Sequence, residues 1–163
     1  MKQSLALAIL TFALLASACK EQPEATGSRI ASLDEIFERD ELVILNDDGD
    51  PLTFDIYLAT SFEQQRRGLM FVRDLPEKTG MLFVYDDDSM HSMWMKNTYI
   101  PLDIVFARRD GSVSSVIHDT EPLSLESLSS IEPVTYVLEL NAGVARRYKI
   151  GAGSQLVRSA DSG

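Results

Sequence analysis

The chain is short of the side chains that many hydrolases and metalloenzymes use. It has one cysteine, Cys19, and two histidines, His91 and His118, among 163 residues. Two histidines whose spacing does not bring them together are too few for a histidine-rich catalytic zinc site. No G-x-S-x-G sequence is present to supply a serine nucleophile, which would in any case need a histidine base. We therefore expect neither zinc nor serine hydrolase chemistry, and no cofactor.

Positive charge is also scarce. The 15 Lys and Arg residues against 25 Asp and Glu residues give a net charge of −10, and such a field repels nucleic acid. The 45% apolar and 25% charged residues lie in the ordinary globular range, and the length suits one domain. We expect a single folded domain with no nucleic-acid partner.

The first 18 residues have the organisation of a signal peptide. Lys2 is followed by an apolar run over residues 5–15 and then by Ala16-Ser17-Ala18-Cys19. The apolar stretch of 15 residues, 4–18, is shorter than the roughly 20 residues that a membrane-spanning helix needs. The four residues that end at Cys19 resemble a lipobox, although Ala16 stands where that pattern prefers leucine, so ordinary cleavage that leaves a free thiol remains the alternative.

Lipidation of Cys19 would make the protein an envelope lipoprotein that faces the periplasm or the exterior, with the membrane as a partner. It would also remove the only thiol from chemistry, and loss of Lys2 with residues 1–18 would change the net charge from −10 to −11. Residues 19–31 are polar and read as a flexible tether, and residues 32–163 form the predicted domain. Lys20, directly after the cysteine, suits sorting to an outer membrane.

Short apolar and β-branched runs recur through the domain, with turn-forming residues between them. Residues 42–45 and 52–58 flank the turn 46–51 and predict a hairpin. Short helices are predicted from Ser32 to Glu38 and over residues 61–68. Further strands are predicted at residues 81–85, 91–95, 103–107, 113–117 and 136–140. The pattern predicts a mainly β fold, a compact antiparallel sandwich or barrel-like domain with one or two short helices.

His91, Met93 and Met95 are spaced by two residues in a predicted strand, so they would share one face of the sheet. One imidazole and two thioethers suit Cu(I) outside the cytoplasm. Methionine also commonly fills irregular cores, so a methionine-rich core strand with a histidine at its edge is the competing interpretation.

The densest polar cluster is the run of residues 94–98, in which Lys96 and Asn97 directly follow this strand. Arg67 supplies a further cation from another segment. A lysine and an amide at a turn can donate hydrogen bonds to an anionic or carbonyl-bearing ligand. Alternatively, Lys96 pairs with Asp103 or Glu139 and stabilises a strand crossing. These two carboxylates are also a candidate acid and base pair, whose separation the sequence does not provide.

Five blocks of the chain together resemble the DUF192 family, also called UPF0127, over about residues 42–157. They are residues 67–70, 80–83, 94–98, 100–103 and 136–143. The resemblance implies a compact, mostly β domain, often on exported proteins, but no agreed reaction. The positions that match the polar motif residues of the family are Arg67, Lys96, Asn97, Asp103, Glu139 and Asn141. Met93 departs from the pattern, which usually has an aromatic residue there, and this weakens copper binding as a property of the whole family.

These observations favour a membrane-anchored, extracytoplasmic binding or accessory module. Its ligand would be a small polar molecule or an envelope component, bound near Lys96, Asn97 and Arg67. An enzyme that uses Asp103 and Glu139 is the alternative, and a periplasmic copper-binding protein ranks third.

Overall fold

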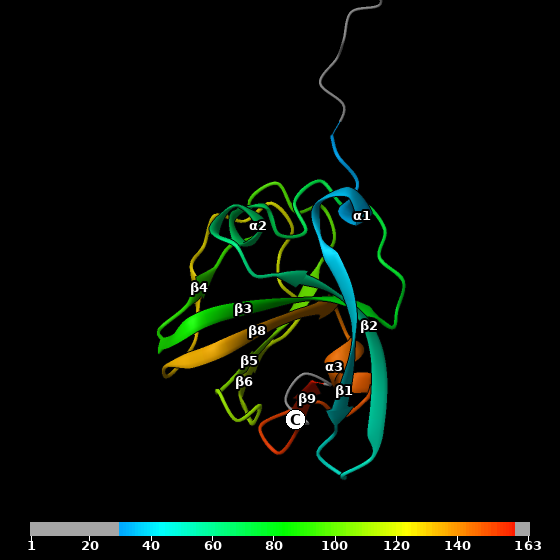
Figure 1. Cartoon of the computed structure of the whole chain (residues 1–163), viewed down its shortest axis with the longest axis vertical. Coiled ribbons are helices and arrows are strands. Elements are labelled where there is room, and N and C mark those ends of the chain that lie inside the picture. The colour runs from blue at the N-terminus through cyan, green and yellow to red at the C-terminus, as the bar shows by residue number, and fades with distance from the viewer. Residues whose placement is uncertain (1–29, 159–163) are drawn as a thin grey trace, which may run out of the picture.

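The computed structural model describes residues 30–158 (Figure 1). Cys19, the signal peptide 1–18 and most of the tether 19–31 lie outside these residues, so the predictions about them stay predictions. Nine strands and three short helices are present in the described part, which confirms the mainly β fold. Within residues 30–158, no helix has both the length and the apolar character that crossing a membrane requires.

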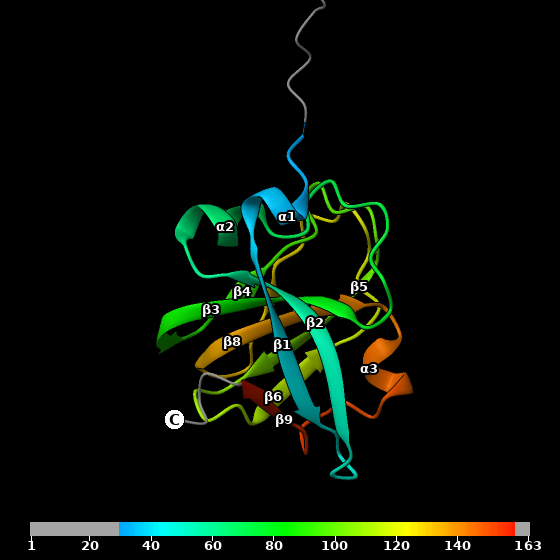
Figure 2. The same ribbon diagram turned by 45° about the vertical axis from the view of Figure 1, so that its right-hand side comes forward.

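Seven strands form one sheet in the order β6-β5-β8-β3-β2-β1-β9. In chain order they are β1 (Glu38–Leu45), β2 (Pro51–Ala59), β3 (Thr79–Ser89), β5 (Leu102–Ala107), β6 (Val113–Ile117), β8 (Val134–Asn141) and β9 (Gln155–Arg158). A separate pair joins β4 (Ser92–Met93) to β7 (Leu128–Ser129). The sheet curls so that the edge strand β9 approaches the turn before β6, where the Leu156 N–H donates to the carbonyl of Gly111 at 2.8 Å. The result is a half-barrel, as the barrel-like prediction requires (Figure 2).

One strand pair is parallel, whereas every other pair in the sheet is antiparallel. β2 and β3 run in the same direction, with Tyr57 opposite Met81, and the crossover between them contains α2 (Phe62–Arg67). A parallel pair needs such a crossover, because a tight hairpin reverses the chain. The predicted hairpin of residues 42–58 is confirmed as the antiparallel pair of β1 and β2.

Both faces of the sheet are buried. The concave face encloses an apolar core that includes Phe54, Leu82 and Leu138. The convex face packs a second core, which includes Phe83 and Phe106, beneath the loops of residues 68–78, 90–101 and 118–133. Alternation along β8 sends Leu138 and Leu140 to the concave core and Val137 to the convex one. The two faces of β8 therefore serve two different cores.

The two N-terminal helices lie together at one end of the sheet, beside the start of the described chain (Figure 1). α1 (Leu33–Ile36) begins behind Ser32 with the predicted capping box and ends before the predicted Glu38. The Gln64 side chain of α2 donates from Nε2 to the carbonyl of Ile36 at 2.9 Å and so joins the helices. The third helix, α3 (Val144–Arg147), and the edge strand β9 were not predicted.

Candidate functional site

Two cavities adjoin under α2 and the loop that carries residues 90–98. The first, the Glu139 cavity, has a volume of about 380 Å³ and is lined by buried residues, among them Leu69, Phe83 and Glu139. The second, the Lys96 groove, has a volume of about 440 Å³ and is lined by Arg67, Lys96 and Asn97 among others. Both cavities share four lining residues, namely Arg66, Arg67, Met70 and Trp94. The two cavities are therefore neighbours with a common wall, and we treat them together as one site.

α2 places Arg67 between the two cavities. The helix begins behind Ser61, whose hydroxyl accepts the Gln64 N–H at 3.3 Å, and Arg67 is its last residue. Gly68 ends the helix with φ at +46°, and a Cβ there would lie 3.3 Å from the Phe83 ring. A glycine is favoured at this turn because other residues rarely adopt such backbone angles. The predicted helix over residues 61–68 is thus confirmed, and it directs Arg67 toward the site.

Arg67 is held by backbone oxygens rather than by an acid. Its Nη1 donates to the carbonyl of Gly68 at 3.2 Å and to the carbonyl of Met70, and its guanidinium carbon lies 5.2 Å from the Phe71 ring centre. Partial burial lowers the pKa of Arg67, although a guanidinium stays charged at neutral pH. None of the salt bridges among the described residues includes Arg67. Its positive charge is available to a ligand.

Lys96 and Asn97 approach Arg67 across the Lys96 groove. Lys96 Nζ lies 4.9 Å from the centre of the Trp94 ring, and no carboxylate of residues 30–158 forms a salt bridge with it. The predicted alternative, in which Lys96 pairs with Asp103 or Glu139, is therefore not what the structure shows. Arg67, Lys96 and Asn97 come together as the sequence analysis expected.

The groove also contains two residues with unfavourable backbone angles. Phe71 has φ at +69° and Asn97 has φ at +57°. The Phe71 N–H donates to the carbonyl of Asn97 at 2.8 Å, so the two segments stabilise each other. Asparagine tolerates this region, but a bulky aromatic residue there is a real outlier. Backbone strain of this kind persists only where the surrounding structure stabilises it, and it is found most often at functional sites.

Glu139 is the buried acid of the site. It lies on the convex face of β8 with 4% of its surface exposed, and its Oε2 has no hydrogen-bond partner among the residues described. Burial raises the pKa of Glu139 from 4.5 to about 8, because the charged form is poorly solvated there. Buried polar groups are nearly always paired, so an unpaired carboxyl group in a cavity needs an explanation.

Tyr85 and His91 form an aromatic wall of the Glu139 cavity. Their ring centres are 3.5 Å apart and their planes differ by 16°, which is a stacked arrangement. Burial and, secondarily, the charge of Glu139 raise the pKa of Tyr85 to about 12. Burial is also the main cause that lowers the pKa of His91. Both rings are consequently uncharged at neutral pH.

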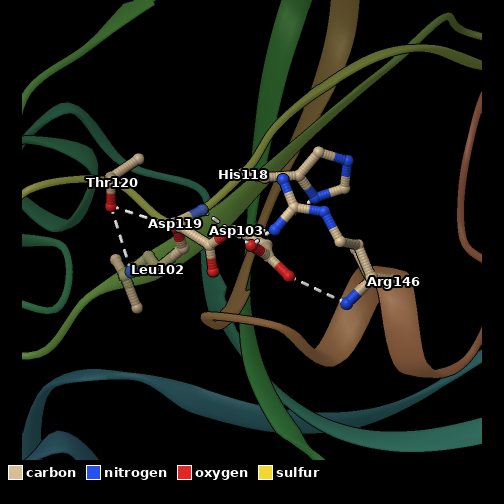
Figure 3. Close-up of polar contacts among 7 residues, drawn as sticks. Leu102, Asp103, His118, Asp119, Thr120 and Arg146 are labelled. Carbon is tan, nitrogen blue, oxygen red and sulfur yellow. Dashed lines mark hydrogen bonds and ion pairs between the residues drawn. The ribbon is translucent and has the colours of Figure 1, made fainter.

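Asp103 lies on the other side of the sheet. Its Oδ1 accepts the Asp119 N–H at 3.0 Å, and its Oδ2 accepts the Ala145 N–H at 2.9 Å (Figure 3). His118 Nδ1 is 3.6 Å from Oδ1. These contacts attach the start of α3 and the segment after β6 to β5, so Asp103 has a structural role. Since Glu139 projects from the opposite face, the two carboxylates cannot act on one substrate as an acid and base pair.

Asn141 also has a structural role. Its Nδ2 donates to the carbonyl of Leu75 at 2.7 Å and to the carbonyl of Pro76 at 3.3 Å. These bonds attach the loop of residues 68–78 to the end of β8. Asn141 does not line either cavity.

The structure separates the three residues of the suggested copper site. The strand is only Ser92–Met93, so the alternation expected over residues 91–95 is not maintained. His91 stacks on Tyr85, whereas Met95 is fully buried and its sulfur accepts the Thr120 hydroxyl at 3.2 Å. His91 and Met93 line the Glu139 cavity, but Met95 does not. Among residues 30–158, no group of three or more His, Cys, Asp or Glu side chains could hold a metal ion.

Sequence reasoning missed the contributions of Phe71 and Tyr85. Phe71 gave no signal, because its positive φ results from the hydrogen bond to Asn97 in a distant segment. Tyr85 alternates with Met81 and Phe83 along β3, so it falls on the same face as those buried residues. The same alternation, read from the sequence, could have predicted that Tyr85 shares a face of the sheet with Glu139 of the neighbouring strand β8.

The family model for DUF192, described as "Uncharacterized ACR, COG1430", matches residues 43–157. The chain belongs to the DUF192 family. The resemblance in the sequence is thereby confirmed, and the matched range includes every residue of the site described above. The chain matches no curated protein.

Two solved structures have the same fold as this DUF192 chain. One, from Sinorhizobium meliloti 1021, is a protein whose assignment as a transcription regulator is provisional. It shares 34% identity at a TM-score of 0.74, with 76% of this chain and 95% of that chain covered. The other, from Novosphingobium aromaticivorans DSM 12444, is a protein of unknown function. It shares 28% identity at a TM-score of 0.69, with 79% and 99% covered.

Proposed function

We propose that this DUF192 protein is a lipid-anchored, extracytoplasmic binding module whose site takes a small polar ligand bearing an anionic group. The observation that carries the proposal is the arrangement of Arg67, Lys96 and Asn97. These residues come from two distant segments and line one groove, and neither cation has a carboxylate partner among the residues described.

The groove offers several kinds of donor to an anion. Lys96 contributes an ammonium group and Arg67 a planar guanidinium, which suits carboxylate and phosphate oxygens. The side-chain amide of Asn97 adds a neutral donor. Its Nδ2 donates to the sulfur of Met70 over a long distance of 3.9 Å. The half-exposed Trp94 ring supplies an apolar wall for the ligand.

Lipid anchorage at Cys19 supports the same proposal from the sequence side. The described chain begins at Ile30, at the end of the domain where α1 and α2 lie (Figure 1). Residues of α2 line the site. An anchor at Cys19 would be joined to this end of the domain by the short tether 19–31. The site would then be presented close to the envelope.

Other functions gain less from the geometry. Asp103 and Glu139 occupy opposite faces of the sheet, so an enzyme built on that pair has no common place for a substrate. A copper site on His91, Met93 and Met95 is disfavoured, because Met95 is fully buried in the core. The S. meliloti relative has a provisional assignment as a transcription regulator. For this chain, regulation by direct binding to DNA is disfavoured by the net charge of −10.

Calorimetric titration of the purified protein with inorganic phosphate tests the proposal. Lys96→Ala and Asn97→Gly should each weaken phosphate binding at least about tenfold, which is the loss of one charged or polar contact worth about 1.4 kcal/mol. Glycine is the better replacement for Asn97, because alanine would be strained at a φ of +57°.

Lys78→Ala is the matched control, since Lys78 lies over the rings of Phe54 and Tyr148, outside the lining of both cavities. It should leave phosphate binding unchanged. If the variants at Lys96 and Asn97 lower only the melting temperature, or if phosphate binds the wild type and all variants alike, the groove is structural and the proposal fails.

A further inference from the structure

The Glu139 cavity and the Lys96 groove carry opposite charges at different depths. Arg66 and Lys96 are exposed, and Arg67 is half-buried, so the cations lie on the solvent side. Glu139, with only 4% of its surface exposed, is a buried part of the wall of the Glu139 cavity. A molecule that enters the site therefore meets positive charge first and a carboxyl group afterwards.

The carboxyl group of Glu139 is suited to a partner that the protein does not supply. Its Oε2 is buried without a hydrogen bond, and none of the salt bridges among residues 30–158 involves it. An unpaired polar group of this kind destabilises the fold by about 1–3 kcal/mol, more for a charged one. A ligand group that donates hydrogen bonds would remove this cost, and an ammonium group also neutralises the charge.

Neither a simple anion nor a simple cation fits the whole site. An anion at Arg67 and Lys96 leaves Glu139 unpaired, whereas a cation at Glu139 would occupy a cavity that Arg66 and Arg67 also line. Between the two ends the walls are apolar or aromatic, with Phe83, Tyr85, Met93 and Trp94 among the lining residues. Such walls suit the short hydrocarbon linker of a zwitterion.

We propose, on the basis of the function proposed above, that the ligand is a small zwitterion whose ammonium group binds Glu139 and whose phosphate or carboxylate binds Arg67 and Lys96. The ammonium group donates to the buried carboxylate, as in other charge-assisted hydrogen bonds. The nearby Tyr85 and Trp94 rings add favourable faces for a positive charge. Phosphoethanolamine has this chemistry, both as a free molecule and as the headgroup of a phospholipid.

The protonation state of Glu139 makes the inference sensitive to pH. At neutral pH the raised pKa keeps Glu139 mostly protonated, so an ammonium ligand must displace that proton. Binding should therefore become about tenfold tighter from pH 7 to pH 9, as Glu139 is deprotonated through a pKa of about 8. The other titratable or charged groups that line the cavity keep their state in this interval. They are Tyr85 with a pKa of about 12, His91 with a lowered pKa, and the guanidinium of Arg67.

Calorimetric titration of the purified full-length protein with matched probes tests the inference. The zwitterions are O-phosphoethanolamine and β-alanine, and the matched single charges are ethyl phosphate and ethanolamine. At pH 8, at least one zwitterion should bind at least about tenfold tighter than ethyl phosphate, and ethanolamine should bind weakest. Glu139→Gln should abolish the advantage of the zwitterion and its pH dependence while ethyl phosphate still binds.

Glu38→Gln, a change of an exposed glutamate on β1, is the matched control. It should alter neither the advantage of the zwitterion nor the pH dependence of its binding. If ethyl phosphate binds as well as both zwitterions, the zwitterion inference fails while the proposed anion-binding function stands. If no anionic probe binds, both fail. Tightest binding of ethanolamine alone overturns both as well.

The source of the ligand is decided by one more probe. Dihexanoyl phosphatidylethanolamine carries the same headgroup on short acyl chains. Tighter binding of this lipid than of O-phosphoethanolamine, lost in Glu139→Gln, supports a lipid headgroup. Preference for O-phosphoethanolamine supports a free zwitterion.

Discussion

Asp103 and Glu139 lie on the neighbouring strands β5 and β8 and project from opposite faces of the sheet. Asp103 is opposite Leu140 in the ladder, and Glu139 is opposite Ile104, so the side-chain alternation separates the two carboxylates. Asp103 accepts two backbone N–H groups, whereas Glu139 Oε2 accepts none. One buried acid therefore supports the fold, whereas the other has a carboxyl oxygen without a hydrogen-bond partner among the residues described.

Replacement of Asp103 should affect stability. Asp103→Asn keeps the size of the side chain but turns one acceptor into a donor that faces a backbone N–H. We expect the free energy of unfolding to fall by about 2–4 kcal/mol, measured by urea denaturation, because a buried N–H loses its charged partner. Asp55→Asn, at an exposed position of β2 with a single ion pair of 4.0 Å, should change stability by less than about 0.5 kcal/mol. Equal effects of the two variants would contradict the structural role of Asp103.

Glu139 should make stability depend on pH. Its pKa is about 8 in the folded protein and 4.5 for an unperturbed glutamate, so the folded state binds the proton more tightly. The stabilisation that protonated Glu139 contributes is complete below pH 4.5 and is lost as the pH rises through 8. A shift of this size corresponds to several kcal/mol, with about 5 kcal/mol as the upper end.

Glu139→Gln removes this titration. The difference between the unfolding free energies of wild type and variant, measured by urea denaturation from pH 5 to pH 9, should therefore move in favour of the variant as the pH rises. Glu38→Gln is the control and should give a nearly constant difference. A constant difference for Glu139→Gln would show that Glu139 is charged and paired.

Gly80 should tolerate no side chain. It lies in β3, and a Cβ there would be 2.7 Å from the carbonyl oxygen of Glu139 and 2.8 Å from Cδ2 of Leu140. Gly80→Ala should reduce the free energy of unfolding by about 2–4 kcal/mol, because the neighbouring strand must shift. Gly49→Ala is the comparison, since a Cβ there has nothing within 4 Å and only the φ of +83° is unfavourable. It should cost about 1 kcal/mol, and thermal denaturation of both variants measures the contrast.

Cys19 should hold the protein to a membrane. Cys19→Ser cannot be acylated, so the protein should move from the membrane fraction to the soluble fraction, and labelling with radioactive palmitate should disappear. Replacement of Lys20 is the control and should leave the label in place. Persistent membrane association of unlabelled Cys19→Ser would contradict the lipoprotein assignment.

The sequence by itself determined the family, the mainly β class and the hairpin of β1 and β2. The family follows from the resemblance of five separate blocks, whereas the class and the hairpin follow from turn residues between apolar runs. The capping residues Ser32 and Ser61 likewise predicted the first two helices. The sequence also pointed to Arg67, Lys96 and Asn97 as polar positions. Local patterns report which residues prefer strands and turns, but they carry little information on which strands become neighbours.

Tertiary structure alone decided the order of the strands, the parallel pair of β2 and β3, and the face on which each acid projects. The expected strand over residues 91–95 is only Ser92–Met93 in the structure, where it pairs with the two residues of β7. Burial likewise depends on the whole chain, since Glu139 becomes an unpaired acid only when α2 and the loop of residues 90–98 cover β8. Sequence patterns therefore supplied the candidate residues, and long-range packing decided which of them share a cavity.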